Sequence, residues 1–434
     1  MVVFLLVMVV VLALLGAVHW YVWRRLVRDV TRRGSLPRRL GTAAAVVLPL
    51  LSFAALGSAR AGAPFRLQQV VAWPGFLWLA LLLYVTLALV VGEAVRPLLR
   101  AWLARKDAKA AVPATAAAPA PVPEPVPAAA GPSAPVEPPA TDSPAPAPAP
   151  PTAPAAPTDV SRRLFVSRVV GGAAAAAAVG TVGYGTYGVL RGPRIKRVTV
   201  PLAKVPRAAH GYRIAVVSDI HLGPILGRAH TQRIVDAINS TQPDLIAVVG
   251  DLVDGTVENL GPAAEPLARL RARHGSFFVT GNHEYFSGAD AWVDHVRELG
   301  LRPLRNERVE IAAGFDLAGV DDIAGESEGQ GPDFVRALGD RDRARAAVLL
   351  AHQPVVVHDA VRHGVDLQLS GHTHGGQLWP GNYLAELANP TVAGLERYGD
   401  TQLYVSRGAG AWGPPVRVGA PSDITLVQLA SKQA

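Results

Sequence analysis

Ser370–Gln377 has the sequence SGHTHGGQ, in which two histidines are separated by one residue and flanked by glycines. Residues two apart in extended backbone point the same way, so His372 and His374 can face one centre. Imidazole is the commonest metal ligand among side chains. The glycines allow the close backbone approach and the positive φ that a sharp turn after a strand needs. Two surface histidines would give the same short pattern, so its interpretation as a metal site depends on the rest of the chain.

Four other stretches have the same form, an apolar run followed at once by residues that bind metals. These are RIAVVS (213–218) before Asp219 and His221, DLIAVV (244–249) before Asp251, SFFVT (276–280) before Asn282 and His283, and AAVLL (346–350) before His352. The run 365–369 leads into the opening stretch. Short apolar runs without polar alternation suit strands buried on both faces, and ligands bind beyond the carboxyl ends of such strands. We therefore predict an α/β fold in which five distant motifs meet at one edge.

The motifs D-x-H, G-D-x-x-D, G-N-H-E, a lone His and G-H-x-H occur in this order, and the series resembles the calcineurin-like metallophosphoesterase superfamily. The tail, which includes Gly413–Arg417, is similar to the membrane-anchored branch of that superfamily, which contains twin-arginine-exported members. The resemblance covers roughly the last half of the chain, and no metal ligand of the family is missing. It implies a sandwich of two sheets packed face to face, with helices outside. The apolar runs Gln402–Ser406 and Thr425–Leu429 would be late strands of this sandwich.

The resemblance also implies a site for two divalent metal ions. Asp251 would bridge them; Asp219, His221 and His374 would complete the first metal, and Asn282, His352 and His372 the second. A hydroxide bridging the metals would attack the phosphorus, and His283 would act on the leaving-group oxygen as a general acid or hydrogen-bond donor. Mixed carboxylate, imidazole and amide ligands suit Mn, Fe, Zn or Co without choosing among them.

Several residues keep two interpretations. Asp219, Asp251 and Asn282 follow strands, where Asp and Asn also form turns and helix caps. Asp254 could cap a helix or support a metal ligand, and Glu284 is expected beside the site or at a helix start. Arg407 and Arg417 could hold phosphate, although arginines in loops are commonly just solvated.

The charge of the chain is divided between two halves. Residues 1–193 carry 18 Lys+Arg and 7 Asp+Glu, a net of +11; residues 194–434 carry 24 and 27, a net of −3; together they give the overall +8. Because the basic residues lie among the apolar segments, they argue for membrane topology and against a nucleic-acid partner. The absence of cysteine excludes disulfides, thiolate metal sites and a cysteine nucleophile.

Three apolar segments, Val2–Trp23, Leu40–Gly57 and Trp73–Gly92, are long enough to cross a bilayer. The first connection holds seven arginines, Arg24, Arg25, Arg28, Arg32, Arg33, Arg38 and Arg39, whereas the second holds only Arg60 and Arg66. We therefore expect the first connection in the cytoplasm and the N-terminus outside. Residues 1–106 form the predicted three-helix membrane region.

Residues 107–160 are dominated by Ala and Pro, and we predict a disordered linker because such a chain cannot bury enough apolar surface to order itself. Residues 161–192 begin with Ser161-Arg162-Arg163-Leu164-Phe165 and continue as a Gly/Ala-rich apolar stretch, which looks like a twin-arginine export signal or a fourth membrane helix. The run Ala173–Ala178 also offers a cleavage site. Either interpretation carries the catalytic domain, residues 193–434, outside the cytoplasm, although Arg191, Arg194, Lys196 and Arg197 oppose that orientation.

The sequence thus predicts a membrane-anchored, binuclear-metal phosphoesterase that hydrolyses phosphodiester or pyrophosphate bonds. The expected partners are the bilayer, the twin-arginine export machinery and a phosphorylated lipid or small molecule of the cell envelope. The alternatives are a phosphate-binding sensor or scaffold without turnover, and a cytoplasmic nucleotide or phosphoprotein phosphatase.

Overall fold

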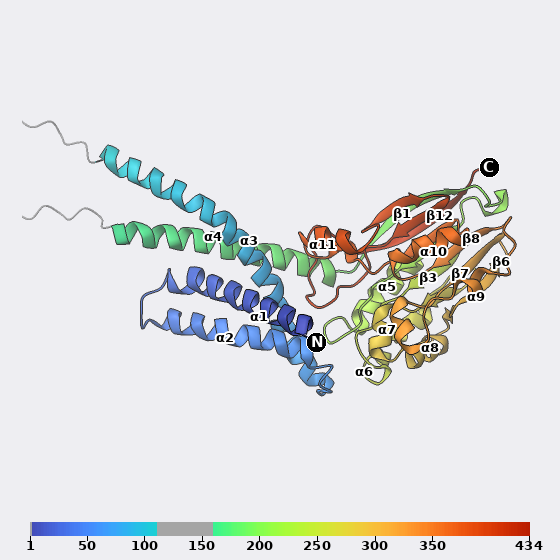
Figure 1. Ribbon diagram of the computed structural model, residues 1–434, viewed down its shortest axis with the longest axis horizontal. Helices are drawn as coiled ribbons and strands as arrows, with labels where there is room; N and C mark the ends of the chain where they lie inside the picture. The colour runs from blue at the N-terminus through green and yellow to red at the C-terminus, as the bar shows by residue number, and fades with distance from the viewer. Residues whose placement is uncertain (1, 111–158) are drawn as a thin grey trace, which may run out of the picture.

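The computed structural model describes residues 2–110 and 159–434, which form a group of long helices followed by a two-sheet domain (Figure 1). Most of the predicted linker, residues 107–160, lies outside the described residues. Its two ends, residues 107–110 and 159–160, belong to helices and so correct the predicted bounds.

Within residues 2–110 and 159–434, four helices are long and apolar enough to cross a membrane. They are α1 (Val2–Trp23), α2 (Leu36–Gly57), α3 (Phe65–Ala110) and α4 (Asp159–Leu190), and the short π-helix η1 (Arg24–Arg28) continues α1. The third helix is much longer than the predicted span Trp73–Gly92. Its apolar part packs on α4, where Ala80, Leu89, Ala174 and Ala178 are buried together.

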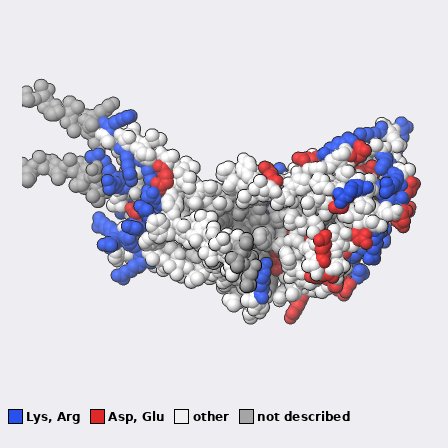
Figure 2. Space-filling model, viewed as in Figure 1, with Lys and Arg blue, Asp and Glu red and all other residues white. Residues whose placement is uncertain are grey.

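Lys and Arg side chains gather at the end of these helices that lies away from the two-sheet domain, and a largely uncharged band separates them from it (Figure 2). That end contains the connection between α1 and α2, the last turns of α3 and the first turns of α4 (Figure 1). The predicted charge asymmetry is therefore also an asymmetry in space.

The domain contains two six-stranded sheets. The first has the order β1 (Arg194–Leu202), β12 (Asp423–Ser431), β2 (Arg213–Val217), β3 (Leu245–Val249), β4 (Ser276–Val279) and β5 (Arg302–Pro303). The second has the order β10 (Gly394–Tyr398), β11 (Thr401–Val405), β9 (Leu367–Ser370), β8 (Ala346–Leu350), β7 (Phe315–Gly319) and β6 (Glu307–Ile311). Strands β2 to β5 are parallel, as are β11, β9, β8 and β7. The late strands predicted from the sequence are β11 and β12.

The two sheets pack face to face, as predicted. Val216 and Val249 of the first sheet share one buried cluster with Leu317, Val348 and Leu367 of the second. These side chains come from strands with buried residues on both faces, which explains their unbroken apolar sequences.

Helices cover the outer faces of both sheets (Figure 1). The first sheet is covered by α5 (Arg228–Ser240), α6 (Val257–Ala264) and α8 (Ala289–Glu298), the second by α9 (Phe334–Leu338) and α10 (Val357–Arg362). Two further helices lie next to the motifs: α7 (Asn282–Ser287) begins inside the G-N-H-E motif, and α11 (Gly381–Ala388) follows the G-H-x-H motif. The expected sandwich flanked by helices is thus confirmed.

The loop 412–418 packs the domain against the membrane helices. Val416 is fully buried in the same cluster as Ala80 of α3 and Val182 of α4. Beside it, the hydroxyl of Tyr84 donates to the carbonyl of Trp379 at 3.0 Å, and the amide of Arg417 donates to the carbonyl of Gly185 at 3.4 Å. The two-sheet domain therefore rests on one end of the helices.

Candidate metal centre

The predicted ligands all follow the carboxyl ends of strands, but these strands belong to both sheets. Asp219 and His221 follow β2, Asp251 follows β3 and Asn282 begins α7 after β4, whereas His352 follows β8 and His372 and His374 follow β9. Because the sheets are packed face to face, their parallel strands end at a common edge of the sandwich. The structure thus brings seven side chains from distant parts of the sequence to one place.

Asp219, His221 and His374 form the first group of donors. His374 Nε2 lies 3.0 Å from His221 Nε2 and 3.3 Å from Asp219 Oδ1. All three residues are buried. Their donor atoms converge closely enough to share one cation.

Asp251, His352 and His372 form the second group. His352 Nε2 lies 3.1 Å from Asp251 Oδ2, and Asn282 Oδ1 lies 3.0 Å from His372 Nδ1. The amide oxygen of Asn282 therefore lies beside this group.

Asp251 also faces the first group. Its Oδ2 atom is 3.7 Å from His221 Nε2, besides being 3.1 Å from His352 Nε2. A single carboxylate oxygen thus stands between the two sets of donors, which is the position required of a bridging ligand. Surrounding histidines lower the pKa of Asp251 far below its ordinary value despite its burial, so the carboxylate is ionised.

In two of the histidine ligands, a hydrogen bond at Nδ1 orients the ring so that Nε2 points into the site. His221 Nδ1 is 3.0 Å from Asp254 Oδ1, and His352 Nδ1 is 2.9 Å from the carbonyl of Val249. Since a carboxylate or carbonyl oxygen only accepts, each Nδ1 carries a proton and each Nε2 can bind a metal when the ring is neutral. His352 Nε2 is buried and makes no well-aligned hydrogen bond with any described residue, although Asp251 Oδ2 lies 3.1 Å away.

His283 lies at the border of the site. Its Nδ1 is 2.6 Å from Asp254 Oδ1, and its Nε2 is 4.0 Å from Asp251 Oδ2. The ring is 16% exposed and is flanked by Phe286 and Trp412, with ring centroids 5.5 and 5.8 Å away. Asp254 therefore holds both His283 and His221. Burial raises the pKa of Asp254, but the two histidines more than offset this and bring it to about 2.

Glu284 supports the backbone of the site. It is fully buried and accepts hydrogen bonds from the amides of Gly281 at 2.6 Å, Leu252 at 2.8 Å and Asp251 at 2.9 Å. Burial, with the nearby charge of Asp251, raises the pKa of Glu284 to about 7. The residue thus joins the loops after β3 and β4.

The two arginines predicted to hold phosphate lie in different surroundings. Arg417 is buried behind His374, where its guanidinium donates to the carbonyl of Gly410 at 2.7 Å, the carbonyl of His374 at 3.0 Å and His374 Nδ1 at 3.1 Å. This position suits support of His374 better than contact with phosphate. Arg407 is half-buried and lines a pocket of about 300 Å³ together with Trp379 and Asn382, so it stays a candidate for phosphate.

Comparisons with known proteins agree with this geometry. Residues 212–376 match the family model of the calcineurin-like phosphoesterases. An uncharacterized metallophosphoesterase of Aquifex aeolicus is 35% identical over 243 residues, which are 55% of this chain and 92% of that protein. The chain belongs to the calcineurin-like phosphoesterase family.

Other relatives match this chain over only part of their own length. A Danio rerio protein named "Transmembrane protein with metallophosphoesterase domain" is 39% identical over 264 residues, 58% of this chain and 60% of its own length. An uncharacterized metallophosphoesterase of Helicobacter pylori strain J99 is 38% identical over 251 residues, 57% of this chain and 67% of its own length. The chain thus spans only part of these relatives. The crystal structure of a dimetal phosphatase from Danio rerio is 13% identical and covers 50% of this chain and 91% of its own, with a TM-score of 0.34.

The donor set of this phosphoesterase fits a metal site. Two groups of nitrogen and oxygen donors lie on either side of Asp251. The buried His352 Nε2 atom makes no well-aligned hydrogen bond among the described residues, and a bound cation would satisfy it. Unpaired buried polar atoms are costly, so such an atom among side chains that commonly bind metals points to a bound ion.

Sequence reasoning missed part of the site. The aromatic rings of Phe286 and Trp412, which flank His283, were not predicted; Phe286 directly follows the G-N-H-E motif and could have been found there, whereas Trp412 lies far from every motif. Of the two interpretations of Asp254, the structure favours support of the histidines.

Proposed function

We propose that this family member is a phosphoesterase that uses two divalent metal ions to hydrolyse phosphodiester or pyrophosphate bonds. The position of Asp251 Oδ2, between the two groups of donors, carries this proposal. Asp219, His221 and His374 would hold one metal, Asn282, His352 and His372 the other, and Asp251 both. The metals, Mn, Fe, Zn or Co, would neutralise phosphate charge and make water a better nucleophile near neutral pH.

The protein's own residues would orient the substrate and move a proton. His283 stands at the open border of the site with Asp254 fixing its Nδ1, so its Nε2 can face a leaving-group oxygen. Arg407, in the adjacent pocket, would hold a phosphate oxygen.

The surroundings of His283 support a substrate at the membrane surface. Trp412, beside that ring, begins the loop that packs on the membrane helices, and Gly413 approaches Phe76 of α3. The site therefore opens next to the helices and not at the opposite end of the domain. A phosphorylated lipid or another envelope molecule at the membrane surface would reach it directly.

The helix α11 supports this proposal. It has no buried residue, and the side chains of Tyr383, Leu384 and Leu387 are 59%, 72% and 84% exposed. The preceding Trp379 contacts α3 through Tyr84, so α11 lies at the same end of the membrane helices. An amphipathic helix of this kind suits the boundary between lipid and water.

The membrane topology is part of the proposal. The arginine-rich end of the helices would face the cytoplasm and the two-sheet domain the outside, because Lys and Arg concentrate on the cytoplasmic side of membrane proteins. Arg194, Lys196 and Arg197, which opposed this orientation, belong to β1 and so to the folded domain. Export by the twin-arginine machinery would begin at Arg162 and Arg163, near the start of α4.

A test of the activity uses the purified full-length chain in detergent with Mn²⁺ and bis(4-nitrophenyl) phosphate. The wild type is expected to release nitrophenol, and Asp251→Asn is expected to fall to the rate of the buffer blank. Asp236→Asn, an exposed change on α5, controls for the substitution and should retain the rate. Equal rates for wild type and Asp251→Asn would refute the mechanism, whereas phosphate binding without turnover would favour the sensor.

A further inference from the structure

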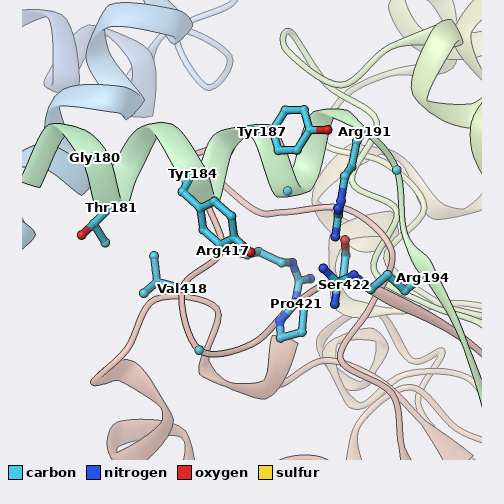
Figure 3. A pocket seen from close by; sticks show the side chains of 13 residues that line it. Gly180, Thr181, Tyr184, Tyr187, Arg191, Arg194, Arg417, Val418, Pro421 and Ser422 are labelled. Carbon is cyan, nitrogen blue, oxygen red and sulfur yellow. The ribbon is translucent and has the colours of Figure 1, made fainter.

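A second pocket, of about 500 Å³, lies between the last turns of α4 and the loop Arg417–Ser422 (Figure 3). None of the seven metal ligands lines it. It lies where the fourth membrane helix meets the folded domain, and the proposed hydrolysis does not use this pocket.

The two ends of this pocket differ in chemistry. Arg191, Arg417 and Ser422 gather at one end, and Thr181 and Val418 lie at the other (Figure 3). Arg194 also lines the charged end, and both Arg191 and Arg194 are exposed, whereas Arg417 is buried with its donors engaged. Two arginines therefore remain available to an anion.

The wall formed by α4 is made mostly of small residues. Gly180 and Gly188 line the pocket, and a Cβ atom added at either would meet nothing within 4 Å. Tyr184 and Tyr187 lie between them and are 73% and 61% exposed. Tyrosines at the end of a membrane helix favour the headgroup level, where an apolar ring and a polar hydroxyl are both satisfied.

We propose that this pocket binds one membrane phospholipid with an anionic headgroup. Arg191 and Arg194 would pair with its phosphate, and its acyl chains would run along α4 past Tyr184 towards Gly180. Since α4 ends at Leu190, the arginines lie at the helix end, where lipid phosphates are found, while the glycine-lined part lies in the apolar segment. A free phosphate would satisfy only the charged end, so the apolar length of the pocket favours a lipid.

The bound lipid would also act on the metal centre, a consequence that rests on the proposed function. Arg417 lines the pocket and donates to the His374 ring and carbonyl. A lipid that orders the loop Arg417–Ser422 would therefore steady His374. Arg417 is in this sense a positioning residue, and hydrolysis of a soluble phosphodiester should be faster with anionic lipid than without it.

Binding is tested on the purified full-length protein in detergent by native mass spectrometry, with phosphatidylglycerol and phosphatidylcholine as probes. Wild type is expected to retain phosphatidylglycerol in preference to phosphatidylcholine. Gly188→Leu fills the pocket and should abolish this retention, whereas Gly183→Leu, on the same helix but outside the pocket and equally free of clashes, should not.

The charged end is tested with Arg191→Gln/Arg194→Gln. We expect affinity for phosphatidylglycerol to fall about thirtyfold, from roughly fivefold for each arginine near an anionic headgroup. Arg197→Gln/Arg207→Gln removes two exposed arginines elsewhere on the domain and should bind as wild type does.

Each outcome decides the proposal. Equal retention by wild type, Gly188→Leu and the Arg191/Arg194 variant would overturn it, as would full displacement of the lipid by inorganic phosphate. Asp251→Asn should bind phosphatidylglycerol like wild type, because the pocket contains no metal ligand. If the wild type binds phosphatidylglycerol but hydrolyses no phosphodiester, that result counts against the proposed function and leaves the lipid site standing.

Discussion

Asp254 shows how one side chain outside the ligand set can determine the behaviour of the whole site. Its carboxylate contacts the ring of His221, which belongs to the first donor group, and the ring of His283, the proposed proton donor. Such support fixes both the orientation and the protonated nitrogen of an imidazole.

Asp254→Asn should therefore lower kcat by about 10- to 100-fold, because replacing a carboxylate that supports a metal ligand typically has an effect of this size. The measurement is the rate on bis(4-nitrophenyl) phosphate at saturating Mn²⁺, with Asp236→Asn as the control. A rate within a factor of about two of wild type would show that the contacts do not matter for turnover.

Gly371 lets two motif loops approach each other. A Cβ atom at this position would collide with Ser218 Oγ and with a carboxylate oxygen of Asp219. Gly371→Ala should displace Asp219 and reduce the bound metal below the wild-type amount, measured as metal per chain after gel filtration. Gly227→Ala, where a Cβ meets nothing within 4 Å, should leave metal content unchanged. If both variants bind metal like wild type, the close approach is not needed.

The backbone at the ligands could not be predicted from residue types. Asp219, His221, Asp251, His372 and His374 all have positive φ, between 50° and 73°. Gly375 and Gly376 adopt this conformation as the sequence suggested, with φ of 62° and 81°, but these five ligands adopt it as well. Non-glycine residues rarely occupy this region, and such strain persists at functional sites where surrounding contacts enforce it. The hydrogen bonds of Glu284 to the Asp251 loop are contacts of this kind.

At the scale of elements, the strands that the sequence revealed are those in the interior of the sheets. β2, β3, β4, β8 and β9 have neighbours on both sides and buried faces, so their apolar runs are unbroken. The edge strands β1, β5, β6 and β10 were missed, because they are short or carry polar residues on exposed faces. The interior strand β7 was missed too, because Asp316 interrupts its apolar sequence. β1 is the clearest case, since its residues Arg194, Lys196 and Arg197 resembled the flank of a membrane helix.

The helix α11 offers a test of the membrane-facing site that does not touch the metal ligands. Leu384→Glu/Leu387→Glu should reduce hydrolysis of a phospholipid substrate in vesicles by about tenfold or more, since burying one leucine contributes roughly 1.5–3 kcal/mol. Hydrolysis of a soluble phosphodiester should be unchanged.

Val335→Glu on α9 provides the matched control, because Val335 is 70% exposed but lies on the outer face of the second sheet. It should alter neither rate. If the α11 variant and the control give the same ratio of lipid to soluble rates, α11 does not rest on the bilayer.

At the scale of the whole molecule, three features indicate that the metal centre faces the membrane. The metal centre opens beside the loop that packs on α3 and α4, α11 exposes its apolar residues at the same end, and the arginines gather at the opposite end (Figures 1 and 2). The sequence predicted the charges and the ligands separately. It could not predict that the site faces the helices, because the residue types of the loop 412–418 do not show which surface the loop packs against.

This arrangement predicts a single orientation, and the absence of cysteine makes it directly measurable. A lone cysteine can be introduced as Ser327→Cys, exposed on the two-sheet domain, or as Ser35→Cys in the arginine-rich connection. In intact cells, a membrane-impermeant maleimide should label Ser327→Cys and should label Ser35→Cys only after permeabilisation. The reverse pattern would put the catalytic domain in the cytoplasm. The proposed substrate would then be a cytoplasmic nucleotide or phosphoprotein and not an envelope molecule, because a site that opens at the inner membrane surface cannot reach molecules outside.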